Sequence, residues 1–209
     1  MRKSRAVFLD RDGVLNDLEY NPEEGRIGSP LSAKQLRISR YAGESVRRIK
    51  ELGFKAILVS NQPGVAKRQF TSSELERMNE KVRKELAKHG CSFDAEYYCL
   101  HHPHALVPKY RLDCDCRKPK PGLLFRAAKE NDLDLGNSFF VGDALIDVKA
   151  GRAAGCKTIL LGHPTTFLSM MIEREDARPD FMLPSLKHVP DLLRSLKSEG
   201  TTKGEKARN

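Results

Sequence analysis

Tryptophan is absent from this 209-residue chain, aromatic residues make up only 7% of it, and cysteine occurs five times. No apolar run approaches the roughly 20 residues of a transmembrane helix. The basic N-terminus carries one short apolar stretch, Ala6–Leu9, which is too short for the core of a signal peptide. Five unevenly spaced cysteines are also too few for the disulfide framework of a small secreted protein. These absences argue against a membrane-spanning or secreted chain and lead us to expect a cytoplasmic protein.

Acidic residues are in the minority: 28 stand against 37 lysines and arginines, which gives a net charge of +9. Such an excess indicates an anionic partner, which could be a phosphate ester, a nucleic acid or a membrane surface. Several of the charges lie in residues 197–209, which contain no large apolar side chain and are expected to form a disordered tail. The remaining residues, 1–196, are enough for a single α/β domain with a core of its own.

Short apolar runs alternate with amphipathic stretches along the chain. Each run is continuous, as expected for a strand covered on both faces, and the runs predict strands at Ala6–Leu9, Ala56–Val59, Ala95–Tyr98, Phe139–Val141, Thr158–Leu161 and, at an edge, Phe181–Leu183. Helices are expected at Glu44–Leu52, 71–90, 122–129 and Asp147–Ala154. This alternation predicts a doubly wound, Rossmann-like parallel sheet with helices on both faces. Residues 17–40 are expected to be a long loop over the sheet, and such loops are often functional.

Two carboxylates directly follow the first predicted strand. Asp10 and Asp12 flank Arg11, which is left free to turn away, and Gly13 lets the chain bend sharply as it leaves the strand. Ligands bind at the carboxyl ends of the strands in doubly wound sheets. One carboxylate there can attack phosphorus and form an aspartyl phosphate, while a second carboxylic acid protonates the leaving oxygen and later activates water. Taken alone, the same residues also fit an ordinary acidic turn.

Three later segments supply what a phosphoryl group needs. Ser60 follows the second predicted strand and offers a hydroxyl and a backbone N–H to a phosphate oxygen. Lys118 precedes a predicted helix and supplies a point charge for the phosphoryl group or for the nucleophile. Asp143 follows a later strand and could hold Mg²⁺ together with Asp10. Asp147 is expected to cap the next helix or to orient its neighbours.

The order of these motifs resembles that of the haloacid dehalogenase (HAD) superfamily of aspartate-nucleophile phosphatases. The four motifs span most of the chain. The resemblance implies that Asp10 is the nucleophile and Asp12 the general acid/base. It also implies that Asp10, Asp143 and the backbone carbonyl of Asp12 bind Mg²⁺, and that the transferring phosphoryl group is bound by Ser60 and Lys118.

Three of the five cysteines lie within eighteen residues. A Cys-x-His pair and a Cys-x-Cys pair supply three thiolates and one imidazole, which suits a closed, tetrahedral zinc site with a structural role. The expected ligands are Cys99, His101, Cys114 and Cys116. His102 and His104 are alternatives for the imidazole, and an unliganded, reduced cluster is the alternative to metal. This zinc loop, residues 99–116, leads into Arg117 and Lys118 and is expected to order them over the phosphate site. The other two cysteines are expected to be small buried residues, Cys91 and Cys156.

The zinc loop resembles more narrowly the HAD group that includes the histidinol-phosphate and D-glycero-D-manno-heptose 1,7-bisphosphate phosphatases. Twelve residues separate His101 from Cys114, and this span is similar to the longer one of the heptose branch. The resemblance implies a zinc loop in place of a large cap domain, and substrate contacts from Asn61, Gln62, Arg117 and Lys118. Residues 21–38 depart from the pattern of the group, and Pro63 replaces a small polar residue.

The leading prediction is a Mg²⁺-dependent phosphomonoesterase that acts on a small phosphorylated sugar. The substrate that the resemblance favours is a heptose 1,7-bisphosphate, a precursor in lipopolysaccharide biosynthesis. Histidinol phosphate or another small sugar phosphate is the nearest alternative. A nucleic-acid 3′-phosphatase would need a basic groove with stacking aromatics, which the low aromatic content disfavours. A zinc-stabilised nucleic-acid-binding module would have no use for three aspartates at strand ends. No amphipathic stripe is left over, so we expect a monomer without membrane or nucleic-acid partners.

Overall fold

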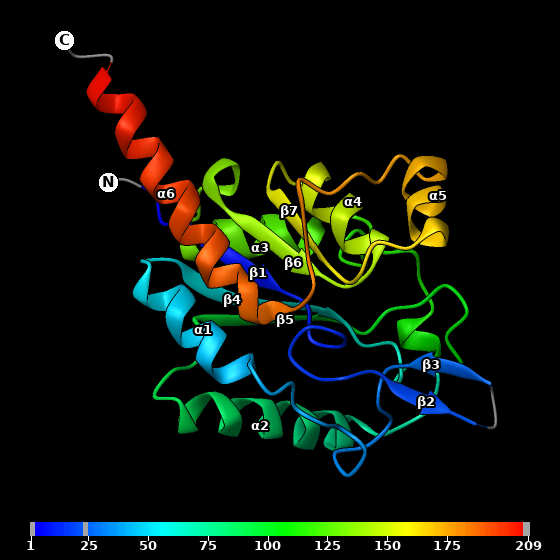
Figure 1. The fold of residues 1–209 in the computed structure, drawn as a ribbon. Coiled ribbons are helices and arrows are strands. Elements are labelled where there is room, and N and C mark those ends of the chain that lie inside the picture. The colour runs from blue at the N-terminus through cyan, green and yellow to red at the C-terminus, as the bar shows by residue number, and fades with distance from the viewer. Residues whose placement is uncertain (1–2, 23–24, 207–209) are drawn as a thin grey trace.

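A sheet of six parallel strands lies between two layers of helices in the computed structural model, which describes residues 3–22 and 25–206 (Figure 1). The order across the sheet is β5 (Ala95–Cys99), β4 (Lys55–Asn61), β1 (Ala6–Leu9), β6 (Phe139–Gly142), β7 (Lys157–Leu161) and β8 (Phe181–Leu183). The chain reverses its direction of winding at β1, which pairs with β4 on one side and β6 on the other. This is the topological switch point, where ligands bind in open α/β sheets.

Alternate side chains of the strands pack into the cores beneath the two helix layers. Val7 and Leu9 of β1 belong to one core, whereas Ala6 and Phe8 belong to the other, and all four are fully buried. The first core lies beneath α1 (Ala42–Glu51), α2 (Ser72–Lys88) and α6 (Val189–Lys206). The second face is covered by α3 (Gly122–Asn131), α4 (Leu145–Ala153) and α5 (Thr166–Arg174). Burial on both faces explains why the strands are continuous apolar runs in the sequence.

The predicted strands and helices are all present, with bounds that differ by no more than two residues from those expected. Thr71 caps the start of α2, because its side chain accepts a hydrogen bond from the Glu74 N–H at 3.1 Å. The doubly wound, Rossmann-like α/β fold is therefore confirmed. None of the helices within the described ranges is long and apolar enough to cross a membrane.

Residues 17–40 differ from the expected loop, because they include an antiparallel hairpin of β2 (Glu19–Asn21) and β3 (Arg26–Gly28) beside the sheet (Figure 1). The strands are three residues long, and their facing apolar side chains, Tyr20 and Ile27, are 63% and 67% exposed. Strands this short and this exposed carry no continuous apolar run, so the hydrophobic pattern gave no signal for them.

The segment from Lys197 onward also differs from the expected tail. α6 continues through it as far as Lys206, and residues 207–209 lie outside the described residues. The sequence contains no proline after Pro190, the residue type that most strongly interrupts a helix.

Candidate active site

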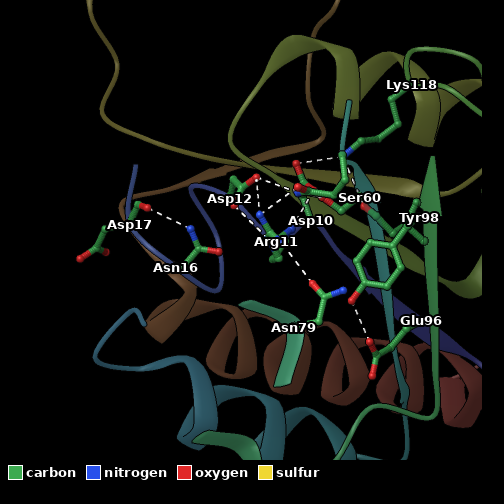
Figure 2. Close-up of polar contacts among 12 residues, drawn as sticks. Asp10, Arg11, Asp12, Asn16, Asp17, Ser60, Asn79, Glu96, Tyr98 and Lys118 are labelled. Carbon is green, nitrogen blue, oxygen red and sulfur yellow. Dashed lines mark hydrogen bonds and ion pairs between the residues drawn. The ribbon is translucent and has the colours of Figure 1, made fainter. Parts of the chain in front are cut away.

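A buried lysine, Lys118, lies among several carboxylates at the carboxyl ends of β1 and β6. Asp10 follows β1, and its backbone N–H donates to the Val141 carbonyl of β6 at 3.0 Å. Lys118 Nζ lies 2.9 Å from Asp10 Oδ2 and 2.7 Å from Asp147 Oδ1, and Figure 2 shows it reaching toward Asp10. The same ammonium donates to the Val59 carbonyl at 3.3 Å. Because the Lys118 side chain is fully buried, protein oxygens compensate its charge.

Burial makes the carboxylates at this site hard to ionise. It raises the pKa of Asp10 to about 6, although the positive charge of Lys118 acts in the opposite direction. Burial, followed by the negative charges of Asp10 and Asp147, raises the pKa of Asp143 to about 7. Burial acts to lower the pKa of Lys118, but the two facing carboxylates outweigh it and hold that pKa above its ordinary value. Carboxylates that repel one another in a buried site are stabilised by a nearby cation.

The donor set fits a divalent cation. Oxygen atoms of Asp10, Asp143 and Asp147 lie within 4.8 Å of one another, and carboxylate oxygens are the ligands that Mg²⁺ prefers. The ligands implied by the resemblance are Asp10, Asp143 and the backbone carbonyl of Asp12, so Asp147 is an addition to the expected set. Asp147 also fulfils its expected role as a cap, because its Oδ2 accepts a hydrogen bond from the Ala144 N–H at 3.2 Å at the start of α4.

Gly13 is what allows Asp143 to reach this cluster. Its backbone has a φ of +75°, and a Cβ at this position would lie 2.1 Å from Asp143 Oδ2. A side chain of any size would therefore occupy the space of the carboxylate, in addition to the strain of the left-handed backbone.

The Asp12 carboxylate faces a second group of polar side chains (Figure 2). Arg11 Nε donates to Asp12 Oδ1 at 3.0 Å, and Arg11 Nη2 donates to Asp12 Oδ2 at 3.3 Å. Gln62 Nε2 donates to Asp12 Oδ2 at 2.9 Å and to Ser60 Oγ at 3.1 Å. Burial acts to raise the pKa of Asp12, but the charge and hydrogen bonds of Arg11 outweigh it and hold that pKa below its ordinary value. Asp12 is therefore held as a carboxylate.

Arg11 was expected only to turn away from the two aspartates, yet it pairs with one of them and never reaches solvent. Its side chain is fully buried, and it also donates to Asn79 Oδ1 of α2 at 3.1 Å and to Gln62 Oε1 at 2.9 Å. An arginine between two site residues was visible in the sequence. Its partner Asn79, 68 residues further along, was not.

The other expected substrate contacts lie at the same edge of the sheet. Ser60 is buried near the end of β4. The amide of Asn61 exchanges two hydrogen bonds of 3.1 Å with the Lys118 backbone, so it fixes the segment that carries the lysine. Arg117 Nη1 donates to the His101 carbonyl at 3.2 Å. The zinc loop is thus joined to the residue before Lys118, and the expected ordering of Arg117 and Lys118 by a bound zinc stays a prediction.

Four side chains of that loop gather into one cluster, made by Cys99, His101, Cys114 and Cys116. The sulfur atoms lie 3.1 to 3.6 Å apart, and His101 Nδ1 lies 3.3 Å from Cys116 Sγ and 3.9 Å from Cys99 Sγ. Tetrahedral zinc with bonds of about 2.3 Å to sulfur sets its ligands about 3.7 Å apart, so the cluster fits such a site. His102 and His104, the alternative ligands, instead contact each other. Of the remaining cysteines, Cys156 is buried as expected, whereas Cys91 in the turn after α2 is only half-buried.

A pocket of about 590 Å³ opens between the β2–β3 hairpin and the turn at residues 62–70. Arg26 of the hairpin and Lys67 of the turn are among its lining residues. Gln62 is one of the lining residues and also donates to the Asp12 carboxylate, so this side chain connects the pocket with the Asp12 group, although Asp12 itself does not line the pocket. The turn is held to the zinc loop because the Ala66 carbonyl accepts the N–H groups of Leu106 and Val107 at 2.9 and 3.0 Å.

Known proteins are similar in sequence to this chain over nearly its whole length. Residues 115–189 match the HAD-hydrolase-like family model. The D-glycero-beta-D-manno-heptose-1,7-bisphosphate 7-phosphatase of Pasteurella multocida is 36% identical over 198 residues, which cover 93% of this chain and 99% of that protein. The chain belongs to this heptose bisphosphate phosphatase family. The family member of the same name from Escherichia coli K12 is 35% identical over 193 residues, which cover 90% of this chain and 93% of that protein.

A solved structure of the heptose bisphosphate phosphatase family has the same fold. The crystal structure of D,D-heptose 1,7-bisphosphate phosphatase from B. bronchiseptica, complexed with magnesium and phosphate, aligns with a TM-score of 0.75 at 26% identity. The alignment covers 91% of this chain and 98% of that one. Membership in the family confirms the predicted resemblance and the predicted enzyme class, a phosphoric monoester hydrolase of the HAD superfamily.

Proposed function

We propose that this protein is a Mg²⁺-dependent phosphatase that removes one phosphate from D-glycero-β-D-manno-heptose 1,7-bisphosphate through an aspartyl phosphate on Asp10. The observation that carries the proposal is the placement of Asp10 at the switch point, with the Lys118 ammonium 2.9 Å from its Oδ2. The names of the relatives favour the 7-phosphate as the group removed.

In the first half-reaction, Asp10 attacks phosphorus and the bond from phosphorus to the sugar oxygen breaks. Asp12, a carboxylate in the substrate-free protein, takes up a proton when the anionic substrate binds and gives it to that oxygen as it leaves. In the second half-reaction, Asp12 takes a proton from water, which attacks the same phosphorus and releases phosphate and the free Asp10 carboxylate. The hydroxyl of Ser60 and the ammonium of Lys118 would bind the oxygens of the transferring group, whose charge must be neutralised in the transition state.

Two metal ions complete the proposal. Asp10, Asp143 and the Asp12 carbonyl would hold Mg²⁺, with Asp147 beside them, and the ion would supply positive charge to the transferring phosphoryl group. The structural zinc would be held by Cys99, His101, Cys114 and Cys116 and would order the segment that carries Arg117 and Lys118.

The rest of the sugar would lie in the pocket between the hairpin and the turn at 62–70. Gln62 lines this pocket and donates to the Asp12 carboxylate, and the positive charges of Arg26 and Lys67 suit a second phosphate. Arg117 and Asn61 would support the site from the side of the zinc loop. A cytoplasmic location, a monomeric state and the absence of membrane and nucleic-acid partners stay predictions.

Phosphate release from a panel of substrates tests the proposal. The panel compares the heptose bisphosphate, histidinol phosphate and a 3′-phosphorylated oligonucleotide, each with wild-type protein and with Asp10→Asn. We expect the highest kcat/KM for the heptose bisphosphate. Asp10→Asn should lose at least about 10³-fold in kcat while its melting temperature stays close to that of wild type. A higher kcat/KM for histidinol phosphate would refute the substrate, and an active Asp10→Asn would refute the nucleophile.

A further inference from the structure

One polar side chain interrupts the buried face of α2. The buried residues of this helix are Leu75, Met78, Asn79, Val82 and Leu86, of which only Asn79 is polar. Asn79 is 4% exposed, and its Oδ1 accepts the hydrogen bond from Arg11 Nη1. A buried amide on an apolar face destabilises the fold unless it is hydrogen-bonded. The hydrogen bond from Arg11 therefore offsets the cost of burying the Asn79 side chain.

Arg11 is oriented from three separate parts of the chain. Its Nε and Nη2 donate to Asp12, its Nη2 donates to Gln62 just after β4, and its Nη1 donates to Asn79 of α2. The guanidinium is flat, and its nitrogens form a rigid fork. Fixing Nη1 at Asn79 therefore sets the direction in which the other two nitrogens meet the Asp12 carboxylate (Figure 2).

We propose that Arg11 and Asn79 are positioning residues for Asp12, with Asn79 acting through Arg11. The proposal rests on the proposed function, because it requires Asp12 to serve as the general acid/base. The proposal makes α2 a support of the reaction, although Asn79 does not itself contact the Asp12 carboxylate and is connected to it through Arg11.

A buried arginine could instead serve only the stability of the fold, and the two roles affect the two half-reactions differently. With p-nitrophenyl phosphate the leaving group departs without a proton, so formation of the aspartyl phosphate does not need Asp12. Attack of water on that intermediate still needs Asp12 as base. A displaced Asp12 therefore slows the second half-reaction alone, whereas partial unfolding lowers both equally.

Rapid mixing of p-nitrophenyl phosphate with enzyme in Mg²⁺ buffer separates the two half-reactions. We expect Asn79→Ala and Arg11→Lys to release a burst of about one nitrophenolate per active site, followed by slow turnover. The ratio of the burst rate to the steady-state rate should rise at least tenfold over the wild-type ratio. Val82→Ala is the matched control, because Val82 is buried on the same face of α2 and belongs to the apolar core. It should keep the wild-type ratio.

Asp12→Asn serves as the reference that tells the two proposals apart. If it turns over without a burst at the wild-type rate, the proposed function fails. If it shows the burst while Asn79→Ala and Arg11→Lys keep the wild-type ratio, the positioning role is overturned and the proposed function stands. Equal slowing of both phases in these variants also overturns it. Thermal unfolding is recorded first, and Arg11→Lys decides if Asn79→Ala is unfolded at the assay temperature.

Discussion

At the scale of single residues, the space around Asp143 is shared with the backbone of Gly13. A Cβ on Gly13 would lie 2.1 Å from Asp143 Oδ2, which is far inside contact distance. We expect Gly13→Ala to displace Asp143 and to lower kcat by about 10²-fold or more, since misplacing a site residue by about 1 Å has effects of that size. Steady-state kinetics with p-nitrophenyl phosphate over a range of Mg²⁺ concentrations measures the loss.

Gly53→Ala is the control for the backbone strain alone. Gly53 has a φ of +82°, and no atom lies within 4 Å of the Cβ that alanine would add. This variant should lose about 1–2 kcal/mol of stability and keep its kcat. An equal loss of activity in both variants would mean that strain, and not the contact with Asp143, explains the effect.

Asp143 also links the stability of the Mg²⁺-free protein to pH. Burial, followed by the charges of Asp10 and Asp147, raises its pKa from 3.8 to about 7 on folding. The folded protein therefore keeps a proton that the unfolded chain releases, and this stabilisation is complete below about pH 4 and is lost as the pH rises through 7. Asp143→Asn should be more stable than wild type at pH 8, by about 1–3 kcal/mol, with the difference closing toward pH 4. Urea unfolding in Mg²⁺-free buffer at both pH values measures it, and a less stable variant at pH 8 would contradict the expectation.

The site residues could be placed from the sequence when they lie at or just after the end of a strand, because parallel strands end at one edge of the sheet. Asp10, Ser60 and Asp143 meet that condition, and the structure brings them to the same edge. Asn79 does not, because it lies within an amphipathic helix whose pattern says only that the position is buried. Its pairing with Arg11 depends on how α2 lies against the sheet, which no local pattern records.

At the scale of elements, the zinc loop is a long connection with little regular structure. Between β5 and α3 it forms only the short 3₁₀ turn Pro108–Tyr110 among the described elements. Its order therefore depends on the cluster at its base and on its hydrogen bonds to the turn at 62–70. Loops of this length are rarely ordered without such support.

Cys114→Ser tests this dependence on metal. We expect wild-type protein to contain about one zinc per chain and the variant to contain little, because the site loses one of its four ligands. The melting temperature should fall by several degrees, and activity should fall as the Arg117 and Lys118 segment loses its support. Metal analysis and calorimetry measure both effects. Cys91→Ser, outside the cluster, should retain zinc, and protein free of zinc from the start would refute the assignment.

Regular elements were predictable from sequence in proportion to the apolar surface that they bury. β1 is fully buried and was located to the residue, whereas the β2–β3 hairpin exposes its apolar side chains and was taken for a loop. The hairpin is held by hydrogen bonds between backbone groups, and the hydrophobic pattern of a sequence does not reveal such bonds. The same segment lines the pocket, so its sequence gave little indication of that pocket.

At the scale of the whole molecule, one sheet contributes side chains to the cores on both of its faces. Neighbouring residues of β1 belong to different cores, so the two cores share the strand at the centre of the sheet. We expect residues 1–196 to unfold in a single cooperative thermal transition, with equal calorimetric and van't Hoff enthalpies. Mg²⁺ with inorganic phosphate, at one hundred times the Kd, should increase the free energy of unfolding by about 2.7 kcal/mol. The transition should then move to higher temperature without splitting in two. Two separate transitions would contradict the assignment of a single domain.

The hydrogen bond from the Asp10 N–H to the Val141 carbonyl has a consequence for amide exchange. Amides at the centre of a sheet exchange with solvent only when the entire molecule unfolds, whereas exposed margins exchange through small local openings. The residue proposed to bond to phosphorus therefore belongs to the slowest-exchanging part of the chain. We expect the hairpin beside the pocket to exchange faster, because its side chains Tyr20 and Ile27 are exposed. Hydrogen exchange followed by mass spectrometry should therefore label the hairpin long before the Asp10 amide.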